Sequence, residues 1–238
     1  MKSLFHLFTF DDTYGPGTDL AMALLGIFIL STAITKKNDV TRNNRLKTIA
    51  ENQIMLINEL AKSYKTKAVY QITAEDSLYL ISTDQGDKNT IAVRNSEISQ
   101  LFTFGESLLF KIGEARLKPE GVKVISDIGQ IIKNNSQLIE EMQIQGHADT
   151  TIPDISDFYK SNIELASARA TTVFSFFKEN SGIDPSEILM SIVSYGEFKP
   201  VQRRKSQTAW NRKSLNNANN TQEERSRNRR IEIVVIYK

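Results

Sequence analysis

The chain has 238 residues, with 30 Lys and Arg against 28 Asp and Glu, two His and no Cys. This near-zero net charge gives no general attraction to nucleic acid or membrane surfaces, and the lack of Cys excludes disulfides, thiolate metal sites and cysteine nucleophiles. Two histidines, His6 and His147, are too few for a histidine-rich metal centre. Because no nucleophile–base set or metal cluster is visible, we expect neither an enzyme nor a cofactor.

An uncharged segment runs from Leu20 to Ile34 near the N-terminus. Extended from Gly17 to Lys36, it is roughly 30 Å long as a helix, about the thickness of the hydrocarbon core of a bilayer. Acidic residues outnumber basic ones before it, which is the wrong sign for a cleaved signal peptide. We therefore predict one uncleaved membrane-spanning helix, within an N-terminal part of residues 1–36.

Asp19 lies at the start of this predicted helix and has two interpretations. It or Thr18 could cap the first turn, because the preceding Gly15-Pro16-Gly17 breaks the chain. Alternatively it could carry a cation or a proton, because an ionisable group at membrane depth is costly and usually functional. The residues alone do not decide between the two.

Residues 37–97 are predicted to form a stem. Val40 to Lys67 has a broad apolar stripe and neither Gly nor Pro, which indicates a helix. This helix could pair with a second copy in a short coiled coil, or pack against its own domain. Three short strands are predicted after it, at residues 68–72, 78–81 and 90–93, with a turn at 84–89.

The predicted C-terminal domain spans residues 98–238, in the order βαβαββ. A first strand region closes at Leu108 to Phe110, and the other expected elements are helices at 118–133 and 161–180 and strands ending at Gly146, Tyr195 and Tyr237. This order predicts an α+β sandwich with both helices on one sheet face. The basic insert between Val201 and Arg230 is expected to be a solvated loop, and we expect no nucleic-acid binding.

The strand that ends near His147 and the helix that follows place Asp149 and Arg169 at one edge of the domain. A carboxylate can hold an ammonium group and a guanidinium can hold a carboxylate, so the pair could grip a zwitterion. Asp149 could instead cap a turn, and Arg169 could pair with Glu164 or Glu197. Asn162 is expected as a helix N-cap, and His147 as a structural hydrogen-bonding residue.

Five motifs in this order resemble the C-terminal domain of the OmpA/MotB/Pal family. They are Phe110 with Pro119-Glu120-Gly121, Ile144 to Asp149, Asn162 to Ala170, Tyr195-Gly196 with Pro200, and Asn228 to Ile233. The resemblance implies peptidoglycan binding, with Asp149 and Arg169 gripping the diaminopimelate of the stem peptide and Asn162 at the helix start. Ala148 and Ala166 replace a Thr and a Ser of the family, and residues 150–157 lengthen an acidic loop, so ligand preference or affinity is expected to differ.

The segment Thr18 to Leu25 loosely resembles the membrane helix of MotB-type stator subunits. That resemblance implies an ion-carrying Asp19, a homodimer inside a ring of MotA-like multi-span subunits, and an inner-membrane protein with its C-terminal domain in the periplasm. The positive-inside rule opposes this orientation, because Lys and Arg follow the helix. We expect a motor of the Zorya phage-defence type; the alternatives are a flagellar stator and a passive wall tether without ion transport.

Overall fold

The computed structural model describes residues 16–238 except 73–76, 84–89, 152–158 and 206–208, and it does not describe the side chains of residues 16–21, 204 and 205. Two compact units are present, residues 1–48 and residues 49–238, and each is described by itself. Helix α1 (Pro16–Ser63) contributes to both units. Of the part of the chain that is described, no helix has the length and apolar character needed to span a membrane.

In the first unit, α1 carries apolar side chains that are exposed in the isolated chain. Met22 is 70% exposed, Phe28 is 65% exposed and Leu30 is 62% exposed. The helix begins at Pro16, a residue that suits a first helical position. Asp19 therefore lies inside the first turn by its backbone rather than at the N-cap, and its side chain is outside the described residues.

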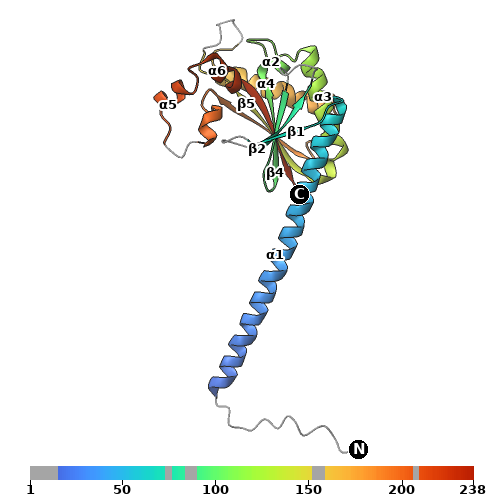
Figure 1. The fold of residues 1–238 in the computed structure, drawn as a ribbon, viewed down its shortest axis with the longest axis vertical. Helices are drawn as coiled ribbons and strands as arrows, with labels where there is room; N and C mark the ends of the chain where they lie inside the picture. The colour runs from blue at the N-terminus through green and yellow to red at the C-terminus, as the bar shows by residue number, and fades with distance from the viewer. Residues whose placement is uncertain (1–15, 73–76, 84–89, 152–158, 206–208) are drawn as a thin grey trace, which may run out of the picture. The chain divides into compact units, whose positions relative to one another are not determined.

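The second unit is built on one seven-stranded sheet (Figure 1). Its order is β1-β2-β3-β4-β7-β5-β6, in which β5 and β6 run parallel and the other neighbours are antiparallel. The strands are β1 (Val69–Ile72), β2 (Ser77–Ser82), β3 (Thr90–Asn95), β4 (Ser99–Gly105), β5 (Ile139–His147), β6 (Leu189–Gly196) and β7 (Arg230–Tyr237). The three strands expected in the stem thus belong to the same sheet as the C-terminal domain.

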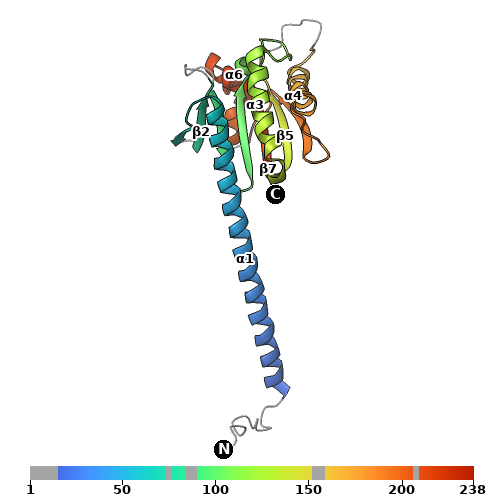
Figure 2. The same cartoon turned by 90° about the vertical axis from the view of Figure 1, so that its right-hand side faces the viewer.

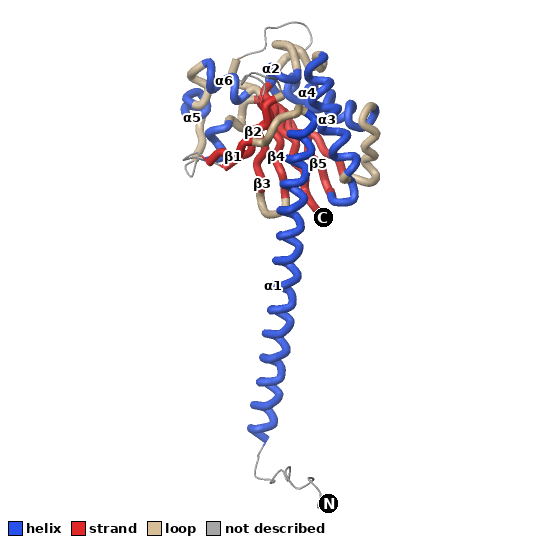
Figure 3. The backbone as a smooth tube through the Cα atoms, turned by 45° about the vertical axis from the view of Figure 1, so that its right-hand side comes forward, coloured by secondary structure: helices blue, strands red, loops and turns tan. Residues whose placement is uncertain are grey.

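Helices α3 (Pro119–Asn134) and α4 (Asn162–Glu179) pack beside each other on one face of this sheet (Figures 2 and 3). The alternating burial of β4 shows the reason, since every second side chain points into the core. Ile125, Ile144 and Phe177 are fully buried between sheet and helices. This arrangement confirms the α+β prediction with both helices on one face.

The end of α1 that belongs to the second unit also joins this core. Ile49, Leu56 and Leu60 are at most 2% exposed and share the core with the sheet. The side-chain amide of Gln53 donates to the carbonyl oxygens of Ser96 and Ser99, at 2.9 and 3.0 Å. Of the two interpretations open for this segment, residues 49–63 therefore follow the one in which the helix packs against its own domain.

Two short segments differ from the sequence-based prediction. Leu108 and Leu109 belong to a helical turn, α2 (Glu106–Leu109), where a strand was expected, because the amide of Glu106 is taken by the carbonyl of Arg229 and the ladder with β7 ends there. The expected basic loop contains short helices: the 3₁₀ helix at Val201–Lys205, α5 (Arg212–Asn217) and α6 (Gln222–Asn228). Thr221 and Glu224 form a capping box at the start of α6, a local signal for a helix. A further 3₁₀ turn, Ser136–Leu138, precedes β5.

Candidate ligand-binding site

The backbone holds Asp149 just beyond the end of β5. The amide of Ala148 donates to the carbonyl of Gly196 at 2.8 Å, which extends the β5–β6 contact past the strand. The amide of Thr151 donates to Oδ1 of Asp149 at 2.7 Å, an Asx turn. Asp149 is only 2% exposed. One carboxylate oxygen of Asp149 thus caps a turn, as one interpretation of the sequence proposed. The other oxygen, Oδ2, forms the ion pair described below.

Asn162 fixes the same turn from the side of α4. Its side-chain amide donates to the backbone carbonyl of Asp149 at 2.9 Å. The expected N-cap role of Asn162 is wrong: Ser161 is the N-cap, with its hydroxyl accepting from the amide of Glu164 at 3.2 Å, and Asn162 is the first helical residue. This one-residue shift frees the Asn162 side chain to reach across to the loop after β5.

Arg169 lies about two helical turns after Asn162, on the same face of α4, and is 2% exposed. Its guanidinium pairs with the Glu106 carboxylate through Nη2 and donates from Nε to the carbonyl of Glu114 at 2.9 Å. The guanidinium carbon lies 5.4 Å from the centre of the Phe110 ring, within the range of a cation–π contact. The ion-pair partner of Arg169 is therefore Glu106 and not Glu164 or Glu197, the two partners considered from the sequence.

Arg229 connects Asp149 to Glu106. Its Nε lies 2.6 Å from Oε2 of Glu106, and its Nη1 pairs with Oδ2 of Asp149. The sheet register explains this position. Residue 230 in β7 faces Gly105 of β4 on one side and His147 of β5 on the other, so the residue before it lies between the two strand ends. The site is thus an alternating row of charges: Asp149, Arg229, Glu106 and Arg169.

The four charges balance in a mostly buried environment. Burial lowers the pKa of Arg169, and the Glu106 carboxylate raises it. An arginine remains protonated under such opposing effects, so the row carries two positive and two negative groups. A carboxylate and a guanidinium at opposite ends of one row can recognise a ligand that bears both an ammonium and a carboxylate group.

A second buried cluster lies next to this row. His147 is 1% exposed, its Nε2 lies 3.2 Å from Oε2 of Glu232, and its ring stacks on Tyr195 at 5.1 Å. Burial lowers the pKa of His147 to about 4, so the ring is neutral at neutral pH. Arg230 donates from Nε to Oε1 of Glu232 at 2.5 Å. This arrangement supports a structural position for His147, in contact with Glu232 and Tyr195, although neither of its ring nitrogens forms a hydrogen bond there.

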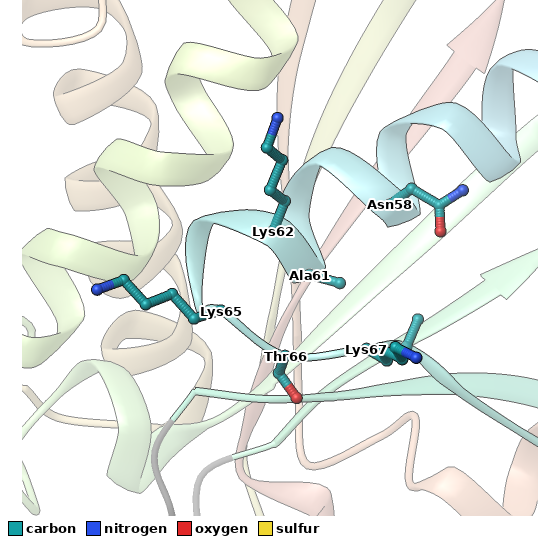
Figure 4. A pocket seen from close by; sticks show the side chains of 7 residues that line it. Asn58, Ala61, Lys62, Lys65, Thr66 and Lys67 are labelled. Carbon is teal, nitrogen blue, oxygen red and sulfur yellow. The ribbon is translucent and has the colours of Figure 1, made fainter.

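One hollow on the described surface is not a comparable site. It has a volume of about 700 Å³ and lies at the end of α1. Figure 4 shows that the side chains of Lys62, Lys65 and Lys67 point in different directions and do not converge on a common point. Among the described residues there is also no group of three or more His, Cys, Asp or Glu that could hold a metal ion.

The structure therefore brings Asp149, Asn162 and Arg169 into one site, as expected, and adds two residues. Glu106 and Arg229 were missed as site residues, although Arg229 stands in one of the five recognised motifs. Their role depends on the position of β7 between β4 and β5, and no local sequence pattern predicts that position. The side chain of Asp19 is outside the described residues.

Residues 109–214 match the model of the OmpA family. This part of the chain, which includes Asp149, Asn162 and Arg169, is therefore similar to the OmpA family.

Within that class the chain resembles MotB. It is 29% identical to Motility protein B of Bacillus subtilis over 136 residues, which are 57% of this chain and 44% of that protein. It is 28% identical to the uncharacterized protein YtxE of the same organism over 149 residues, 62% of this chain and 52% of that one. The chain thus spans about half the length of the curated relatives it matches.

Solved structures share the fold. A putative MotB-like protein from Desulfovibrio vulgaris superposes with a TM-score of 0.57 at 19% identity, covering 81% of this chain and 99% of that one. A periplasmic domain of MotB superposes with a TM-score of 0.51 at 20% identity, covering 71% and 78%. These likenesses establish the architecture of the sheet and its helices, and the MotB-like character rests on the sequence relatives.

Proposed function

We propose that this chain is the peptidoglycan-anchoring subunit of an ion-driven motor in the bacterial inner membrane, similar to MotB. The observation that carries the proposal is the charge row from Asp149 to Arg169, in which these two end members belong to the stretch that matches the OmpA family. Its chemistry suits the zwitterionic end of diaminopimelate in a peptidoglycan stem peptide. Asp149 takes the ammonium group, the arginine end takes the carboxylate, and Asn162 holds the loop that carries Asp149.

The N-terminal part supplies the anchor to the membrane in this proposal. Between Met22 and Ile34, α1 exposes large apolar side chains and no charged residue. A helix that is apolar on all sides is stable in lipid or within a bundle of other helices. The C-terminal domain then lies in the periplasm beside the cell wall, as wall binding requires. The Lys and Arg residues after residue 35 oppose this orientation under the positive-inside rule.

Asp19 is the proposed ion carrier. In a bilayer its neutral form is favoured by desolvation, so it can accept a proton from one side and release it where water reaches it. Two copies of the chain inside a ring of MotA-like multi-span subunits would use this cycle to turn the ring, while wall binding keeps the pair still. The proposed setting is phage defence of the Zorya type.

Retention on purified peptidoglycan tests the wall-binding part. Wild type is expected to be retained, Asp149→Asn and Arg169→Lys are expected to lose most retention, and Glu120→Gln, an exposed change on α3, is expected to behave as wild type. Thermal unfolding of each variant shows whether the domain is intact. Equal retention by all four proteins would refute the site.

Asp19→Asn tests the motor part in cells. The variant is expected to co-purify with a multi-span ring partner and to be inactive. Activity is measured as protection against phage in a plating assay and as swimming in a motility assay. Wild-type activity in this variant would refute the ion-carrier role. Wall retention without any multi-span partner would favour a passive tether instead.

A further inference from the structure

Both charged groups of the proposed grip already have partners within the chain. Oδ2 of Asp149 is occupied by the guanidinium of Arg229, and Nη2 of Arg169 is occupied by the carboxylate of Glu106. An internal cation thus stands where the ligand's ammonium would bind, and an internal carboxylate stands where the ligand's carboxylate would bind. A ligand has to displace at least one of them.

The four side chains are not equally accessible. Those of Asp149 and Arg169 are each 3% exposed and that of Glu106 is 8% exposed, whereas Arg229 is 26% exposed. A ligand arriving from solvent therefore meets Arg229 first. Its backbone is fixed, because its carbonyl accepts from the Glu106 amide at 2.9 Å, so an adjustment at this residue is one of the side chain.

We propose that Arg229 determines the ligand specificity of this site by requiring a zwitterion. The inference rests on the proposed function. When the ammonium group of the ligand binds Asp149, Arg229 leaves that carboxylate and joins Arg169 in pairing with the ligand's own carboxylate, while Glu106 keeps its contact with Nε of Arg229. Every charged group of the row then keeps a partner of opposite charge.

A ligand with an ammonium group alone does not allow this exchange. It takes Asp149 from Arg229 and leaves part of a half-buried guanidinium without a carboxylate, which is unfavourable because a charged donor loses its partner. Arg229 thereby penalises simple amines. The selection works against the wrong ligand as well as for the right one.

Calorimetric titration of the full chain with two probes tests this. One probe is meso-diaminopimelate, and the other is 1,5-diaminopentane, which has the same carbon spacing between ammonium groups and no carboxylate. Wild type is expected to bind the first at least about tenfold more tightly, the equivalent of one lost charge-assisted hydrogen bond. In Arg229→Gln the ratio is expected to fall below about threefold, largely through tighter binding of the diamine. Arg227→Gln, an exposed arginine of α6, is the control and is expected to keep the wild-type ratio.

Each outcome is informative. An unchanged ratio in Arg229→Gln overturns the inference while leaving wall binding intact. If wild type binds neither probe and Asp149→Asn is retained on peptidoglycan as well as wild type, the proposed function fails and this inference fails with it. Should Arg229→Gln not fold, Arg229→Lys replaces it, since a lysine can keep the pair with Glu106 but not bridge to Asp149; a ratio equal to wild type in that variant overturns the inference.

Discussion

Gly146 of β5 and Ala166 of α4 approach so closely that a Cβ atom on Gly146 would lie 2.1 Å from the carbonyl oxygen of Ala166. No flexible side chain is involved, because the obstructing atoms belong to the helix backbone. A glycine at this position is therefore what lets α4 lie against the end of β5. The same contact sets the separation between Asp149, which follows the strand, and Arg169, which the helix carries.

Gly146→Ala is expected to destabilise the domain by about 3 kcal/mol, at the upper end of the usual cost of overpacking, because α4 has to move. The measurement is the free energy of unfolding in urea. Gly105→Ala is the matched control: its φ is −61° and the nearest atom to an added Cβ lies 4.0 Å away. It should change stability by less than about 0.5 kcal/mol. Equal losses in both variants would contradict the close approach.

Glu106→Gln is expected to cost about 3–5 kcal/mol, because it leaves two partly or fully buried guanidinium groups, Arg169 and Arg229, facing a neutral amide. Urea unfolding measures this loss. Combining Glu106→Gln with Arg169→Met should recover part of it, since the unpaired charge is then removed. Glu120→Gln should be nearly neutral, since the Glu120 side chain is 64% exposed and lies 4.0 Å from Lys118. Strict additivity of the two cluster variants would rule out their coupling.

The pH dependence of stability is expected to reflect His147. Burial lowers its pKa from 6.5 to about 4, so the unfolded chain binds a proton between these values that the folded chain does not. Neutral His147 therefore contributes about 3 kcal/mol to the free energy of unfolding above pH 6.5. This contribution falls as the pH decreases from 6.5 and is lost below pH 4. Unfolding free energies at pH 7, 6 and 5 check the slope. His147→Gln should flatten it, and an identical slope in that variant would assign the effect to other groups.

Asn162→Ala is expected to weaken retention on peptidoglycan and to reduce stability by about 1–3 kcal/mol, because the buried carbonyl of Asp149 loses its donor. Ser161→Ala provides a control of similar cost, about 1 kcal/mol, since it removes the N-cap of α4 without touching Asp149. Pulldown on purified peptidoglycan at a fixed protein concentration separates the two. Comparable retention by both variants would show that Asn162 acts through stability alone.

Much of the fold follows from periodicity in the sequence. The helix expected at 118–133 is found at Pro119–Asn134, and α3 and α4 each bury an apolar face, although Val122 and Ile163 are each 40% exposed. Long regular elements are predictable because their buried face repeats at the helical or strand period. Short elements were not: α2 depends on Arg229, a residue far away in the chain, for the contact that ends the strand before it.

The candidate site was predictable in part for the same reason. Asp149, Asn162 and Arg169 lie on a strand end and a helix that are adjacent in the chain, so local order places them together. Glu106 reaches Arg169 across 63 residues of sequence and Arg229 reaches Asp149 across 80. Such pairs depend on which strands are neighbours, and the position of β7 inside the sheet follows from packing rather than from any local pattern.

The central position of β7 makes the hydrogen-bond register of the sheet part of the ligand specificity. In the described sheet, the meander β1–β4 and the parallel pair β5–β6 are joined through β7. A slip of β7 by one residue would turn every side chain to the opposite face and would take Arg229 away from Asp149 and Glu106 together. The charge row therefore forms only when β7 pairs with β4 and β5 in the correct register. A domain with β7 out of register would lose the ligand-binding site as well as stability.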